Sequence, residues 1–130
     1  MGKENAQVAL VVDDSMLIRH TVCRFLEQQG FSVTSATNGL EALQILDEML
    51  PDLIVTDLMM PKMTGSDLIT AVKANPVTSR IPVVVLAARS SARDMKPEGR
   101  ADYVIFKDID IDEQLVKALA ITLGESSAVN

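Results

Sequence analysis

Three short apolar runs of this chain lead directly into charged side chains that can do chemistry. Asp13 and Asp14 follow the first run, Asp57 ends the third and Lys107 follows the fifth. Grouped carboxylates repel one another unless a cation lies among them, and their oxygen atoms suit a hard divalent ion such as Mg²⁺. A lysine beside them supplies a compact positive charge that can meet an anion. An aspartate next to a metal ion and a lysine is the arrangement that attack on a phosphoryl group requires.

These side chains can act together only if the fold brings the ends of those runs to one place. Short apolar runs alternate with amphipathic stretches along the whole chain, and continuous apolar runs are typical of strands covered on both faces. We therefore expect an α/β fold, a doubly wound five-stranded parallel sheet with helices on both faces. Ligands bind beyond the carboxyl ends of the strands in such a sheet, which is where the charged residues fall. The expected strands cover residues 8–12, 32–36, 53–57, 83–88 and 103–106.

The stretches between the strands have helical periodicity and recognisable ends. The first follows Ser15 and ends near Gly30, which is placed for a left-handed helix cap. The second begins after Asn38 and is predicted to run to Leu50, where Pro51 closes it. A third lies between residues 65 and 75, and the last begins at a capping-box pair, Asp110 and Glu113.

The connection at residues 89–100 breaks this pattern. It contains one strong apolar residue, Met95, with a proline and a glycine near its end. Packing of one side chain does not offset the entropy of ordering a helix, so the helix expected between the last two strands is short or absent. Its three arginines, Arg89, Arg93 and Arg100, are interpreted as a solvated loop, with an anion or partner site as the alternative.

Length and composition narrow the class of protein. A chain of 130 residues that is 48% hydrophobic can bury a core in one domain, which we expect at residues 1–124, with a tail or linker at 125–130. A net charge of −6 argues against nucleic acid or an anionic membrane as a direct partner. No apolar run approaches the ~20 residues that span a bilayer. The single cysteine, Cys23, and the lack of an apolar leader favour a cytoplasmic location.

Several candidate residues have ordinary explanations. Asp14 or Ser15 could serve only to cap the following helix, and a lysine after a strand is usually solvated. The joint occurrence of two aspartates, a third aspartate and a lysine at three strand ends favours a site instead. Other polar and sulfur-containing residues are assigned no catalytic role: the helix residues His20 and Cys23, and a methionine cluster that fills the core or contacts a partner, Met59, Met60 and Met63.

The run Val12-Asp13-Asp14-Ser15, the loop at residues 57–65 with its Met-Pro centre, and Lys107 together resemble the receiver domain of bacterial response regulators. The resemblance covers residues 8–123. It implies the strand order 2-1-3-4-5 and phosphoryl transfer onto Asp57 from a histidine kinase or phosphotransfer protein, in a signalling module rather than an enzyme. An aspartate-based phosphatase fits poorly, since a methionine stands where a second acid is expected, and a flavin-binding domain lacks its phosphate loop.

By position, the resemblance also implies the ligands of a metal ion. Asp14, Asp57 and the backbone carbonyl of Met59 would bind Mg²⁺ directly, and Asp13 would join largely through water. Lys107 would pair with oxygens of the phosphoryl group. The kinase, the output and the downstream target are not named by these residues.

The sequence differs from the usual family pattern at several positions. These positions are the ones through which phosphorylation is relayed to an output surface. Ala87 replaces the usual Thr or Ser at the end of strand four, and Asp108 replaces the proline that usually follows the lysine. Val104 occupies the place of the switch aromatic, and Tyr103, one residue earlier, is predicted to face the opposite side of the sheet. We therefore expect phosphorylation with a small conformational response; the alternative is a pseudo-receiver, a protein-interaction module that does not depend on phosphorylation.

Overall fold

The sheet has the predicted parallel strands in the predicted order. The computed structural model describes residues 7–60, 62–88, 101–107 and 110–123. In space the strands follow the order β2-β1-β3-β4-β5, and every neighbouring pair is parallel. The strands are β1 (Val8–Val12), β2 (Ser32–Ala36), β3 (Leu53–Asp57), β4 (Val83–Ala87) and β5 (Tyr103–Phe106).

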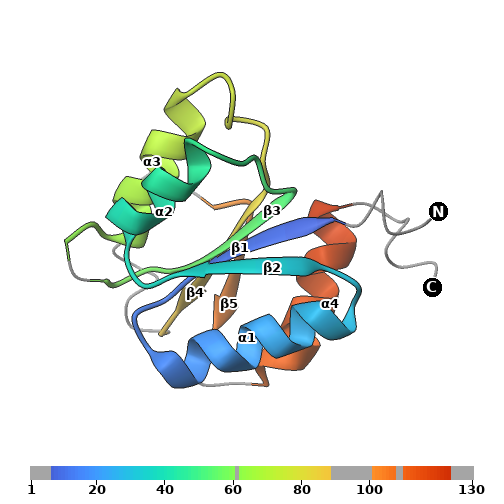
Figure 1. Ribbon diagram of the computed structural model, residues 1–130. Coiled ribbons are helices and arrows are strands. Elements are labelled where there is room, and N and C mark those ends of the chain that lie inside the picture. The colour runs from blue at the N-terminus through green and yellow to red at the C-terminus, as the bar shows by residue number, and fades with distance from the viewer. Residues whose placement is uncertain (1–6, 61, 89–100, 108–109, 124–130) are drawn as a thin grey trace.

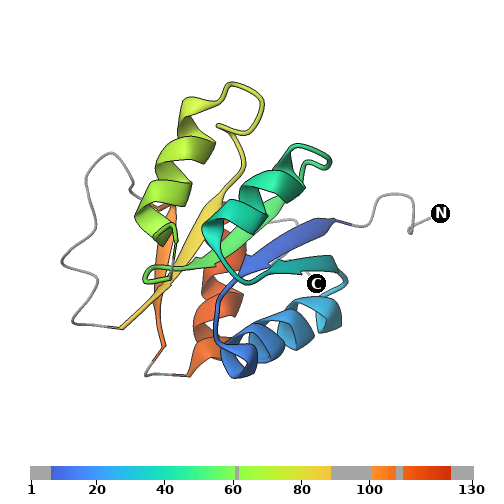
Figure 2. The ribbon, with the colours of Figure 1, turned by 60° about the vertical axis from the view of Figure 1, so that its left-hand side comes forward.

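Helices cover both faces of the sheet. Figures 1 and 2 show α1 and α4 on one face, with α2 and α3 side by side on the other. Each helix begins after a short polar residue whose side-chain oxygen accepts a hydrogen bond from the N–H group three residues on. The helices are α1 (Met16–Gln28), α2 (Gly39–Leu46), α3 (Gly65–Ala74) and α4 (Ile111–Thr122), and their caps are Ser15, Asn38, Thr64 and Asp110.

The two faces of the sheet build two separate hydrophobic clusters, because successive strand residues point to opposite sides. Leu10 and Val12 belong to the cluster beneath α2 and α3, and Ala9 and Val11 to the cluster beneath α1 and α4. All four side chains are fully buried.

The same alternation separates the two residues near the start of β5. Val104 packs in the cluster that contains Ala87, whereas Tyr103 packs against the cluster on the other face. This arrangement confirms the prediction for Tyr103.

Two element ends differ from the sequence prediction. The helix α2 ends at Leu46 rather than Leu50, because the chain turns at once and the N–H groups of Glu48 and Met49 both bond to the carbonyl of Ile45. Leu50 is exposed and lies outside the buried face that the periodicity assigned to it. The strand β4 ends at Ala87 rather than at residue 88. The cap at Gly30 is confirmed by its positive φ of 98°.

Some predictions fall on residues outside the described ranges. They are the short or absent helix and the arginines at residues 89–100, the role of Asp108 and the tail at residues 125–130. None of the helices described for this chain has the length and apolar character needed to cross a membrane.

Aspartates hold together the amino-terminal ends of the strands, opposite the edge where the charged residues gather. Oδ2 of Asp102 accepts a hydrogen bond of 2.8 Å from the N–H group of Val83, at the start of β4. The ammonium of Lys73 on α3 lies 3.1 Å from the same oxygen. Asp52 accepts a hydrogen bond of 2.8 Å from Val8 in the same way, at the start of β1. These contacts brace the sheet far from the candidate site.

Candidate functional site

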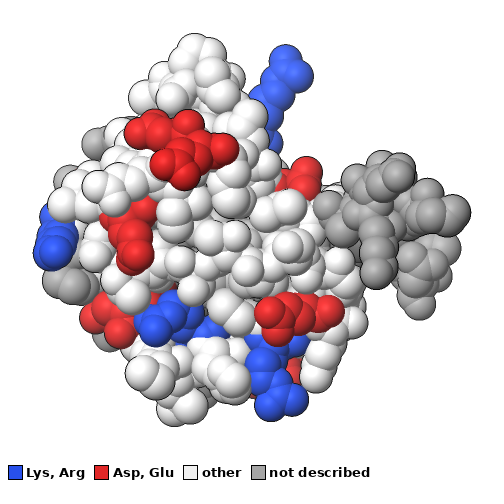
Figure 3. Space-filling model, viewed as in Figure 1, with Lys and Arg blue, Asp and Glu red and all other residues white. Residues whose placement is uncertain are grey.

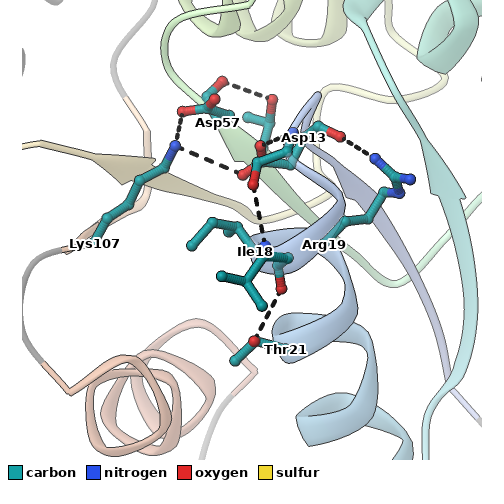
Figure 4. Close-up of polar contacts among 9 residues, drawn as sticks. Asp13, Ile18, Arg19, Thr21, Asp57 and Lys107 are labelled. Carbon is teal, nitrogen blue, oxygen red and sulfur yellow. Dashed lines mark hydrogen bonds and ion pairs between the residues drawn. The ribbon is translucent and has the colours of Figure 1, made fainter.

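The predicted residues meet at the carboxyl edge of the sheet. Asp13 follows β1, Asp57 is the last residue of β3 and Lys107 follows β5. Nζ of Lys107 lies 2.8 Å from Oδ1 of Asp57 and 3.7 Å from Oδ2 of Asp13. Figure 4 shows these side chains turned toward one another. One carboxylate oxygen from each of Asp13, Asp14 and Asp57 lies within 4.8 Å of the others, so the fold assembles the whole predicted acidic group.

Burial divides the three carboxylates. Asp13 is 0% exposed and Asp57 is 4% exposed, whereas Asp14 is an exposed residue. Loss of water around Asp13 raises its pKa to about 6, and the nearby charges of Asp57 and Asp14 add to that effect. The N–H group of Ser15 and the ammonium of Lys107 act in the opposite direction. The site therefore holds more negative charge than its own lysine neutralises.

The buried carboxylate of Asp13 has an oxygen that fits a cation. Its Oδ1 accepts a hydrogen bond of 2.8 Å from the N–H group of Ser15, but its Oδ2 has no hydrogen-bond partner among the residues that the structure describes. The ammonium of Lys107, 3.7 Å away, is too far for a hydrogen bond to this oxygen, and a buried charged oxygen that accepts none costs free energy. A hard divalent ion held by carboxylate oxygens would remove this cost, so the residues present fit Mg²⁺.

Hydrogen bonds hold the turn between β1 and α1. Ser15 caps α1, since its Oγ accepts from the N–H group of Ile18 at 3.3 Å. Ser15 thus performs the capping that was the alternative role for Asp14. The main chain of Asp13 is held on both sides: its N–H group donates to Ala36 O at 3.1 Å, and its carbonyl accepts from Nη1 of Arg19 at 2.8 Å.

The role of Arg19 in this turn was not predicted from the sequence. The position of Arg19 relative to the start of the helix could have indicated this role. Arg19 follows Ser15 by one helical turn, and helix side chains lean back toward the amino terminus, where the carbonyl of Asp13 lies.

The loop after Asp57 folds back onto its own start. The N–H group of Gly65 donates a hydrogen bond of 2.7 Å to the carbonyl of Leu58. A Cβ atom at Gly65 would overlap the carbonyl oxygen of Asp57 and would lie 2.9 Å from Cα of Leu58. Only glycine allows this approach, which explains the residue type at the end of the motif.

The loop also contains the three methionines, whose side chains differ in burial. Met60 is buried in the cluster beneath α2 and α3, and Met63 packs against the same cluster. Met59, whose backbone carbonyl is a predicted metal ligand, has a side chain that is 58% exposed. The sequence left two interpretations of these methionines, core packing and contact with a partner. Core packing is confirmed for Met60 and Met63.

Lys107 is positioned by its own main chain and by a residue of α4. Its N–H group donates to Ala87 O at 2.9 Å, which continues the ladder between β4 and β5. The side-chain amide of Gln114 bonds to both backbone groups of the preceding residue, Phe106. No feature of the sequence marked Gln114, because a glutamine on a helix usually faces water.

The end of β4 offers only a methyl group toward this region. Ala87 is 1% exposed and packs in the cluster that includes Val104. Two other residues weighed in the sequence lie as expected on α1: His20 is exposed, and Cys23 packs against the cluster beneath α1 and α4.

Comparison with known proteins identifies the family of this chain. The model of the response regulator receiver domain matches residues 9–120. The transcriptional regulatory protein PrrA of Mycobacterium tuberculosis is 37% identical over 114 residues, which are 86% of this chain and 48% of PrrA. The receiver domain of a signal transduction histidine kinase from Syntrophus aciditrophicus is 33% identical with a TM-score of 0.83, and the match covers 91% of this chain and 90% of that one.

A chemotaxis response regulator is also similar in structure. The response regulator CheY4 of Vibrio cholerae is 31% identical with a TM-score of 0.80, and the match covers 90% of this chain and 98% of CheY4. The chain spans about half the length of curated relatives such as PrrA. With its sheet order, its acidic group and its family match in agreement, the chain belongs to the response regulator receiver domains of two-component signalling.

Proposed function

We propose that this receiver domain accepts a phosphoryl group on Asp57 from a histidine kinase or a phosphotransfer protein. The observation that carries the proposal is the 2.8 Å ion pair between Lys107 and Asp57, beside a second buried carboxylate, Asp13. The site thus combines the three groups that phosphoryl transfer requires. Asp57 supplies the nucleophilic oxygen, Lys107 supplies positive charge for the transferring group, and Asp13 supplies carboxylate oxygens for a metal ion.

In the proposed reaction a carboxylate oxygen of Asp57 attacks the phosphorus of a phosphohistidine. The new O–P bond forms as the P–N bond breaks, and the imidazole leaves with the electron pair of that bond. The product is an acyl phosphate on Asp57. Lys107 already contacts Oδ1 of Asp57, so its ammonium is placed to bind an oxygen of the arriving phosphoryl group.

Asp13, Asp14, Asp57 and the backbone carbonyl of Met59 are the proposed ligands of Mg²⁺. When bound, the ion supplies positive charge that neutralises the transferring oxygens. Oδ2 of Asp13, which accepts no hydrogen bond from the described residues, and the closeness of the three carboxylates support this assignment. Asp13 is the most buried of the three, and its proposed contact with the ion is largely through water.

Receiver domains are signalling modules, and the output of this one is proposed to be a protein contact. On the face drawn in Figure 3, Lys and Arg side chains lie in separate small groups interleaved with Asp and Glu. Such a face lacks the concentrated positive charge that phosphate contact requires. We place the protein in the cytoplasm, which the free thiol of Cys23 supports.

Incubation with acetyl phosphate and Mg²⁺, followed by intact mass measurement, tests this function. The wild type should gain one phosphoryl mass, and Asp57→Asn should gain none. Asp52→Asn serves as a matched control because Asp52 caps β1 at the other end of the sheet, and this variant should be modified like the wild type. A wild type that stays unmodified, while folded and with Mg²⁺ present, would favour the pseudo-receiver instead.

A further inference from the structure

The strand that leads to Lys107 lies at the edge of the sheet, and a side chain completes its hydrogen bonding. Successive residues of a parallel strand direct their backbone groups to alternate sides. The N–H group of Lys107 donates to Ala87 on β4, so the backbone groups of Phe106 face the side away from β4. There the N–H group of Phe106 donates to Oε1 of Gln114 at 3.0 Å, and Nε2 of Gln114 donates to the carbonyl of Phe106 at 2.8 Å.

The same amide also binds the residue that caps α4. Nε2 of Gln114 lies 3.2 Å from the carbonyl oxygen of Asp110, the residue that caps α4. One side chain therefore joins the last residue of β5 to the first turn of α4. Lys107 directly follows the first of these anchors, Phe106.

We propose that Gln114 is a positioning residue that acts through Lys107. Its amide takes the place of a neighbouring strand and fixes the main chain from which the lysine extends to Asp57 and Asp13. A lysine side chain is long and flexible, so the direction of its ammonium depends on where its Cα atom is held.

This inference rests on the proposed function, because its main readout is binding of a phosphoryl mimic at Asp57. Beryllofluoride with Mg²⁺ is titrated into the full chain, and affinity is followed by backbone amide shifts. Gln114→Leu keeps the approximate size of the side chain but removes all three hydrogen bonds. We expect Gln114→Leu to bind the mimic about 3-fold to 10-fold more weakly, a part of what one charge-assisted hydrogen bond contributes.

A double-mutant cycle separates positioning from stability. In a Lys107→Ala background, Gln114→Leu should cause no further loss of affinity, because the group that it positions is gone. Asp102→Ala is the matched control: it removes a hydrogen bond and an ion pair at the other end of the same strands. It should lower the melting temperature and leave the affinity for the mimic unchanged. Without mimic or metal, amide exchange at Phe106 should accelerate in Gln114→Leu and remain slow in Asp102→Ala.

Equal affinity of wild type and Gln114→Leu would overturn the inference, and so would an equal loss of affinity in both lysine backgrounds. Failure of the proposed function looks different. In that case the wild type itself neither binds the mimic nor gains a phosphoryl mass, whatever residue stands at position 114.

Discussion

Lys107 and Asp57 form an ion pair of 2.8 Å across the end of β4, which lies between their strands in the sheet. The pair links the proposed acceptor directly to the edge strand β5. The strand that it crosses ends in Ala87, which has no hydroxyl group to offer. A change of charge at Asp57 is therefore expected to reach β5 through Lys107 rather than through the end of β4.

The first prediction concerns the size of the response to phosphorylation. A ligand shifts a two-state equilibrium only by the contacts that differ between the states. The missing hydroxyl at Ala87 removes a hydrogen bond worth about 1.5–3 kcal/mol, or about 10-fold to 100-fold in the shift. In the wild type, amide shifts on beryllofluoride addition should stay at the site and at the end of β5 next to Lys107. In Ala87→Thr they should spread through β4 and β5 to α4.

Ala87→Val is the matched control for that experiment. It has nearly the volume of threonine without the hydroxyl, so crowding of the buried site affects both variants alike. Its response should match the wild type. A wild-type response that already reaches α4, and is no larger in Ala87→Thr, would contradict this account of the relay.

The second prediction concerns the loop after Asp57. In Gly65→Ala the new methyl group meets the carbonyl of Asp57 and the main chain of Leu58, neither of which can move without disturbing β3. We expect a loss of about 3 kcal/mol or more in the free energy of unfolding, measured with urea.

Gly30→Ala supplies the comparison for Gly65→Ala. Gly30 has a positive φ of 98° but nothing within 4 Å of the position of a Cβ atom, so only backbone strain is added. The expected loss there is about 1 kcal/mol. Similar losses at the two positions would show that the close approach at Gly65 is not important.

The third prediction follows from the pKa of Asp13, which burial raises from 3.8 to about 6 in the folded protein. The folded state then binds the proton more tightly than the unfolded state. The stability that this proton contributes is complete below about pH 4 and is lost as the pH rises through about 6. Asp13→Asn cannot titrate, so without metal it should gain about 2–3 kcal/mol relative to the wild type between pH 4 and pH 7.5.

Urea unfolding with a chelator at several pH values measures this difference. The asparagine oxygen can still accept the hydrogen bond from Ser15, so the turn should remain intact in the variant. If the difference in stability between variant and wild type does not change with pH, the pKa of Asp13 is not raised in the folded protein.

The fourth prediction concerns Mg²⁺, which should stabilise the folded protein by mass action, by about 2.7 kcal/mol at 100 times its Kd. Asp14→Ala should reduce this effect because it removes a proposed ligand. Glu48→Ala, an exposed acid in the turn after α2, should not. Equal melting temperatures of the wild type with Mg²⁺ and with chelator would count against an assembled metal site.

The strands, their order and the meeting of Asp13, Asp57 and Lys107 could be predicted because parallel topology brings strand ends to one edge. Contacts in which a side chain of one element binds another element could not be predicted. The amide of Gln114 reaches a strand that precedes its helix, and sequence spacing does not reveal that distance.

The different burial of the two adjacent aspartates, Asp13 and Asp14, could not be predicted from the sequence either. Asp13 is buried and Asp14 exposed because Asp13 continues the ladder of β1, with its N–H group bonded to Ala36, while Asp14 begins the turn into α1. The early end of α2 has a similar cause, since the route of the chain into β3 overrides the apolar periodicity that reached Leu50.

The most direct test of the central claim is the position of the modified residue. After incubation with acetyl phosphate and Mg²⁺, borohydride reduces an aspartyl phosphate to homoserine, and peptide mass analysis then identifies the altered position. We predict conversion at Asp57 alone, with Asp13 and Asp14 unchanged because they serve as metal ligands. Conversion at Asp13 or Asp14, or at no aspartate of a folded protein with Mg²⁺ present, would contradict the proposed role of Asp57.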